Sequence, residues 1–162
     1  MTYKVLDVAR YVINYCNEAK QEITNLRLQK ILYFVQACFL VSKGLNNPCF
    51  EEEIEAWSFG PVIPEVYSEF KTYGNSPIPQ IRKYLEVDKR NILQSVFKIY
   101  SCPFQDEEDK ALVNAMIDEC NKVSASRLVE ITHGQTPWKN VYVPRMNNVI
   151  EKRSIYEYFK TR

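Results

Sequence analysis

The 162-residue sequence has few of the residues on which catalytic and cofactor-binding sites depend. It contains four glycines, none adjacent to another, and a single histidine, His133. A phosphate-binding loop needs closely spaced glycines, and a Cys–His or Ser–His pair would have to use His133. No two acids stand out as a catalytic pair, and we interpret the acidic run at 51–55 as a solvated segment. The sequence therefore predicts no catalytic residue and no cofactor.

The cysteines lack a pattern as well. Their number is odd, and no two of them stand at C-x-x-C spacing. Both facts argue against a disulfide scaffold and against a zinc site, so no metal is predicted. We interpret them as small buried apolar residues in a reducing cytosol. They are Cys16, Cys38, Cys49, Cys102 and Cys120.

Charge and hydropathy exclude two further classes. The net charge is +1, and the longest basic clusters are pairs such as Lys89-Arg90. Nucleic-acid binders usually concentrate positive charge, so a nucleic-acid partner is not expected. The chain has no run of about 18 apolar residues and no apolar signal stretch near its N-terminus. We predict a cytoplasmic protein with no membrane partner.

The residues that are present predict a mainly α, compact, multi-helix single domain with a small β element, spanning residues 1–162. A chain of this length buries a sizeable core without cross-links. Apolar periodicity and end signals predict the elements. Helices are expected at 4–18, 25–43, 64–73, 91–101, 107–120, 124–133 and 154–160, a strand at 53–58, an irregular segment at 75–90 with a turn of helix at 81–85, and a turn at Pro137. The buried stripe of the fifth helix is expected at Leu112, Ala115, Met116 and Cys120.

The segment 25–43 is apolar nearly all round, which is typical of a central helix. Its polar residues nevertheless need an explanation, since Gln29, Tyr33 and Gln36 fall on one line of the helix. If that line is buried, each group needs a hydrogen-bond partner, because an unsatisfied buried polar group costs about 1–3 kcal/mol. If the line borders a groove, these residues contact another protein. A DNA-reading helix is disfavoured, because it would present a broader polar face to the groove.

Two other places carry candidate residues. In "EAWSFGPVIPEVYSEFK", residues 55–71, Trp57 and Phe59 stand beside the Gly60-Pro61 break. This corner either closes the core or shapes a surface for a partner. His133 lies at a predicted helix C-terminus, where it either caps carbonyls and packs beside Trp138 or serves a Cys/His-dependent hydrolase.

Three motifs, taken together, resemble a known family. "LRLQKILYFVQACFLVSKG", "EEEIEAWSFGPVIPEVYSEFKTYG" and "SASRLVEITHGQTPWKNV" are similar to the SocA-like, or Panacea, antitoxin domain family. The resemblance implies a largely helical protein without enzymatic activity that neutralises a nearby-encoded toxin by direct contact. It also implies two alternatives, a proteolytic adaptor or a phage or prophage effector that binds a host protein. The oligomeric state stays open.

The motifs and the polar line together define the predicted partner-binding residues. Trp57 and Trp138 are also expected to pack into the core, and Gly60-Pro61 to fix the backbone path. The set is Gln29, Lys30, Tyr33, Gln36, Trp57, Phe59, Pro61, His133 and Trp138.

Overall fold

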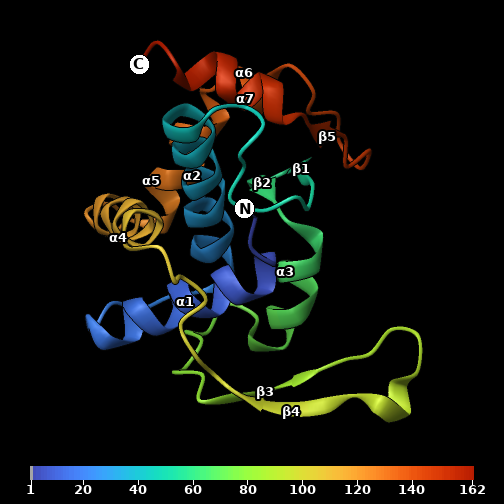
Figure 1. Cartoon of the computed structure of the whole chain (residues 1–162). Coiled ribbons are helices and arrows are strands. Elements are labelled where there is room, and N and C mark those ends of the chain that lie inside the picture. Colours follow the sequence, from blue (N-terminus) through green and yellow to red (C-terminus); the bar gives the residue numbers. More distant parts are fainter. Residues whose placement is uncertain (1) are drawn as a thin grey trace.

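A computed structural model describes residues 2–162, which are mainly α-helical (Figure 1). Helix α2 (Asn25–Lys43) stands at the centre and contacts α1, α3, α4, α5, α7 and strand β2. The hydroxyl of Thr24 accepts a hydrogen bond from the Arg27 N–H and caps its first turn. Gly44, with a φ of 93°, ends it. The predicted central helix is confirmed.

The remaining helices surround α2. Helix α1 crosses one end of it, α4 and α5 lie along one side, and α6 and α7 cover the other end (Figure 1). Their bounds are α1 Val5–Glu18, α3 Pro64–Phe70, α4 Glu107–Asn121, α5 Ala125–His133, α6 Thr136–Lys139 and α7 Lys152–Phe159. A 3₁₀ turn, η1 (Lys71–Tyr73), extends α3 to Gly74. The turn expected at Pro137 is thus a single turn of helix.

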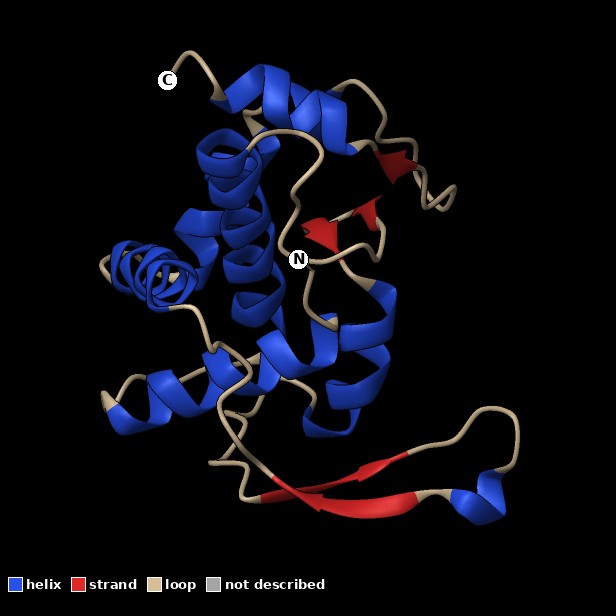
Figure 2. Cartoon of the chain, in the orientation of Figure 1, coloured by secondary structure: helices blue, strands red, loops and turns tan. Residues whose placement is uncertain are grey.

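A small antiparallel sheet lies on the opposite side of α2 from α4 (Figure 2). Its strand order is β2-β1-β5, with β1 at Ile54–Trp57, β2 at Gly60–Val62 and β5 at Val149–Ile150. Trp57 pairs with Gly60, so Ser58 and Phe59 form the turn between β1 and β2. The predicted strand is confirmed over four residues, whereas β2 and β5 have too little pattern to be recognised in the sequence.

The segment from Lys83 to Ile99 corrects the expected helices at 81–85 and 91–101. It forms strand β3 (Lys83–Glu86), a 3₁₀ turn η2 (Ile92–Gln94) and strand β4 (Val96–Ile99). These make a two-stranded arm that runs below α1 and α3 and extends past them (Figure 1). Arg10 of α1 lies over the ring of Tyr84 in β3, 3.5 Å from its centroid. The helical spacing of its apolar residues was misleading, because they face no core: every residue of β4 is exposed.

The buried stripe of α4 is also shifted from the expected one. Val113, Ile117 and Cys120 are buried, whereas Ala115 is exposed and Leu112 and Met116 are only partly covered. The helix is therefore rotated relative to the expected face, and its most buried side chains recur at i, i+4 and i+7.

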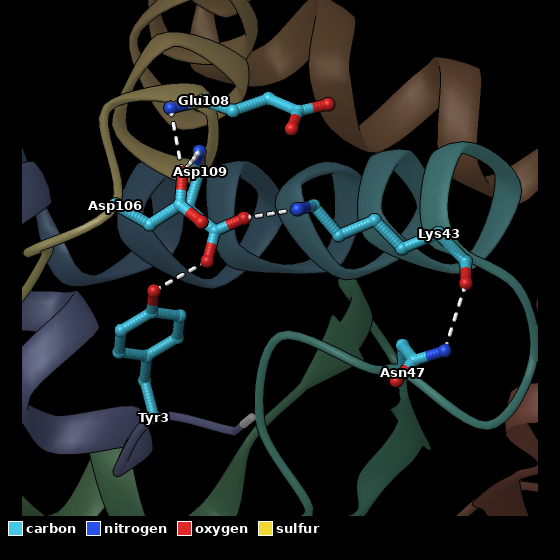
Figure 3. A network of polar contacts seen from close by, with 6 residues as sticks. All are labelled: Tyr3, Lys43, Asn47, Asp106, Glu108 and Asp109. Carbon is cyan, nitrogen blue, oxygen red and sulfur yellow. Dashed lines mark hydrogen bonds and ion pairs between the residues drawn. The ribbon is translucent and has the colours of Figure 1, made fainter.

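A polar network joins three helices at their ends. Tyr3, just before α1, and Lys43, at the end of α2, both contact the carboxylate of Asp109 in the first turn of α4 (Figure 3). Asp106 caps the same turn by accepting from the Glu108 N–H at 2.8 Å. Burial opposes ionisation of Asp109, but the hydrogen bonds from Lys43 and Tyr3 outweigh it and lower its pKa. The network fixes where α4 starts against the core.

Candidate functional site

The polar line of α2 is buried, and every side chain in it is satisfied. Gln29 donates to Asn25 Oδ1 at 2.8 Å and accepts from the Ile63 N–H at 2.9 Å. Tyr33 donates to Gln135 Oε1 at 2.8 Å. Gln36 bridges the backbone of residues 49 and 50, donating to the Phe50 carbonyl and accepting from the Cys49 N–H. These residues hold the neighbouring segments onto α2, and all three are almost fully buried.

Lys30 is the most unusual member of the helix, because its ammonium is fully buried without a carboxylate. Its Nζ donates to the Pro61 carbonyl at 3.0 Å. Desolvation lowers the pKa of Lys30 to about 7. The side chain therefore fastens the β1–β2 hairpin to α2 through a single backbone carbonyl.

Gly60 makes this corner close-packed. Its φ is +106°, and a Cβ there would lie 2.8 Å from both Lys30 Cε and Thr132 Oγ1. Only glycine fits this conformation and this space without strain. Pro61, also buried, follows it on β2. The corner is thus held from behind, and its turn carries Phe59 outward with 66% of its surface exposed.

An aromatic row supports the same corner from the C-terminal half of the chain. The indole Nε1 of Trp138 donates to the Trp57 carbonyl at 2.8 Å. The Trp138 ring stacks on His133 and on Tyr142, with centroid distances of 4.2 Å and 4.4 Å. On the other side, the Trp57 ring packs edge-on against Tyr67 at 5.0 Å. The expected packing of His133 beside Trp138 is confirmed.

His133 is the last residue of α5, and its ring stacks on Trp138. Its Nε2 is buried and has no hydrogen-bond partner. Among residues 2–162, no hydrogen bond joins its ring to a cysteine, serine or threonine.

A groove of about 570 Å³ opens beside the corner. We call it the Phe59 groove. Its residues are Asn25, Leu26, Gln29, Trp57, Ser58, Phe59, Val62, Tyr67, Lys71, Gly74 and Asn75. Three of its large apolar side chains, Leu26, Phe59 and Tyr67, are exposed. Several exposed apolar groups thus stand together on an ordered base, which is how hot spots of protein interfaces are built.

Of the predicted partner-binding residues, the structure brings Gln29, Trp57 and Phe59 to this groove, and of these three only Phe59 is exposed. Lys30 and Pro61 support it from below. Tyr33 and Gln36 lie inside the core away from it, and His133 and Trp138 stack behind Trp57. Sequence reasoning missed Leu26 and Tyr67. The sequence feature that could have identified Tyr67 is its position, three residues after Pro64 and off the apolar stripe of α3.

In the described part of the chain, no three His, Cys, Asp or Glu side chains lie where they would hold a metal ion. None of the described helices has the length and apolarity needed to cross a membrane.

Fold and site together define a small, mainly helical protein whose candidate site is a groove with exposed apolar side chains. The chain belongs to the SocA-like antitoxin, Panacea domain family, whose model matches residues 28–139. It is similar to the antitoxin SocA of Caulobacter vibrioides (strain NA1000 / CB15N), with 38% identity over 117 residues. This match covers 72% of the chain but only 58% of that relative. No solved structure matches the chain significantly.

Proposed function

We propose that this protein is a cytoplasmic antitoxin that neutralises a toxin protein by binding it directly, without catalysis. Family membership and the similarity to a relative named as an antitoxin support the general role. The observation that carries direct binding is Phe59, a large side chain that is 66% exposed on a corner fixed by buried contacts.

The shape of the Phe59 groove supports a protein ligand. Its exposed side chains are apolar and aromatic, flanked by amides and by Lys71. An apolar anchor on the toxin would bury against Leu26, Phe59 and Tyr67, while Lys71 and Asn75 would form the polar rim. Because the base is already ordered, little conformational entropy is lost on binding. A stable complex would bury roughly 1,600 Å² in total, so the groove would form the centre of a larger contact.

The first experiment is inducible expression of the neighbouring open reading frame, with and without this protein. We expect growth arrest that this protein relieves, and a complex that survives purification of the two proteins together. Growth arrest that this protein leaves unchanged would refute the proposal. Relief that depends on a host protease, with loss of the toxin from the cell, would instead establish a proteolytic adaptor.

A pair of variants locates the surface. Phe59→Asp places a charge at the centre of the groove, whereas Met146→Asp alters a residue that is 63% exposed and lies outside it. We expect Phe59→Asp to weaken binding about 100-fold, a typical loss for a hot-spot residue, with an unchanged melting temperature. Met146→Asp should bind normally. Equal binding by both variants would place the interface elsewhere.

A further inference from the structure

We propose that the β3–β4 arm is a second docking element, which accepts a strand from an acidic, apolar segment of a partner protein along the open edge of β4. This inference does not depend on the antitoxin role. It rests on the backbone register of the arm, its exposed apolar side chains and its charge.

The backbone register leaves hydrogen-bonding groups free on β4. The Tyr100 N–H donates to the Arg82 carbonyl at 2.9 Å, and the register continues through Lys98 opposite Tyr84. In an antiparallel pair, bonded and non-bonded residue pairs alternate. The alternation therefore places ladder bonds at Lys98 and turns the N–H and C=O groups of Phe97 and Ile99 toward the open edge.

The same two residues carry the most exposed apolar side chains of the strand. Phe97 is 76% exposed and Ile99 is 86% exposed. Leu85, directly across from Phe97, lies on the same face and is 41% exposed. Side chains of one face thus form an apolar strip beside the unpaired backbone, which is the arrangement used when an added strand supplies both hydrogen bonds and apolar contacts.

The edge also lacks the usual protection against strand pairing. Edge strands are commonly blocked by proline, by a bulge or by lysines that repel another strand. β4 has no proline, and its register with β3 is regular over four residue pairs. Its one lysine, Lys98, is held by Glu86 at 3.0 Å across the ladder. The arm is held on its β3 side, where Arg10 lies over Tyr84, so β4 is the edge that remains open to a third strand.

Charge specifies the partner. Residues 82–99 contain five basic and two acidic side chains, a net charge of +3, whereas the whole chain carries +1. Two arms of this charge repel one another, which disfavours pairing with a second copy. Exposed apolar side chains outnumber the basic ones on the arm, which favours protein over nucleic acid. A strand with both acidic and apolar residues would be attracted by the positive charge of the arm and would pack its apolar side chains against the apolar strip.

The test uses a fluorescein-labelled peptide of about ten residues that alternates valine with glutamate, the length of a long strand. A valine–lysine peptide of the same length is its control. We expect the glutamate peptide to bind the full-length protein and to protect the Phe97 and Ile99 amides from hydrogen exchange. Lys98 should already be protected in the free protein. Absence of binding, or binding without protection of these two amides, would overturn the proposal.

A proline variant tests the edge itself. Ile99→Pro removes an N–H that points outward, so the ladder within the arm is kept. Ile99→Thr retains the N–H and is the matched control. We expect the proline variant to bind the peptide about tenfold more weakly than the threonine variant, a loss of the size of one hydrogen bond. Equal affinities would refute strand addition.

Two further outcomes would overturn the proposal by naming another occupant. A concentration-dependent dimer that Ile99→Pro abolishes would identify a second copy of the chain. Salt-sensitive binding of a DNA duplex by the arm, with no binding of the glutamate peptide, would identify a nucleic-acid contact.

Discussion

The buried Lys30 gives a prediction about how stability changes with pH. In the unfolded chain its ammonium has a normal pKa of about 10.4. In the folded protein desolvation lowers that pKa to about 7. Between these two values the unfolded state holds a proton that the folded state has released. The free energy of unfolding therefore rises with pH across this window.

The size of the effect follows from the shift. Each pH unit within the window is worth at most about 1.4 kcal/mol, so Lys30 should contribute about 2 kcal/mol of additional stability between pH 7 and pH 9. Below pH 7 both states are charged, and the cost of burying the ammonium is fully present. Other groups also contribute in this range, including the buried thiols, whose pKa values are raised by burial in the folded protein and normal in the unfolded chain. The comparison must therefore be a difference against a variant that lacks only this titration.

Lys30→Met supplies that comparison, because methionine keeps most of the aliphatic stem and has no charge. Urea unfolding of both proteins should be measured at pH values from 6 to 9. We expect the stability of the wild type, relative to the variant, to be nearly constant up to pH 6.5 and then to rise by about 2 kcal/mol by pH 9. A flat difference would show that Lys30 titrates normally and that our account of its burial is wrong.

Three further predictions concern the corner that supports the groove and the polar network at the start of α4. Gly60→Ala should destabilise the protein by about 1–2 kcal/mol more than Gly44→Ala. Both positions have a positive φ, but only at Gly60 would an added Cβ meet neighbouring atoms. Urea unfolding of the two variants measures the difference, and equal losses of stability would contradict the prediction. Trp138→Phe should cost about 1 kcal/mol by removing the donor to the Trp57 carbonyl, measured by thermal unfolding; an unchanged melting temperature would show that this bond contributes nothing. Tyr3→Phe should lower the free energy of unfolding by about 1 kcal/mol at pH 7. Because the Tyr3 hydrogen bond favours the ionised carboxylate, this loss relative to the wild type should vanish as the pH falls below 3.8 and through the lowered pKa of Asp109. A loss that persists in acid would refute the role of the ionised carboxylate.

The helices around α2 were predictable because their signals are local. Thr24 and Gly44 bracket α2, and Asp106 and Ser124 cap α4 and α5 as their positions in the sequence predict. The family motifs likewise pointed to the corner at Trp57 and Phe59. Each of these features depends on residues close together in the chain.

The groove and the arm were not predictable in the same way. Lys30 meets Pro61, and Trp138 meets Trp57, across 31 and 81 residues, and no pattern in the sequence marks such contacts. The arm was wrongly predicted as helix from its apolar spacing. Apolar residues lie on both faces of β4, so the strand shows no alternation of apolar and polar residues. A helix there would have needed a core surface that the fold does not offer.

The projecting arm also divides the chain into two parts of comparable size. Residues before its tip supply α1, α2, α3 and the paired strands β1 and β2, and those after it supply α4 to α7. The tip at 88–94 has no buried residue, so a cut there would break no core contact. Of two polypeptides expressed separately, the first would lack the helices that cover one side of α2 and the second would lack α2 itself, so the core would form only when they associate. The arm thus marks where this protein could be split into complementing fragments.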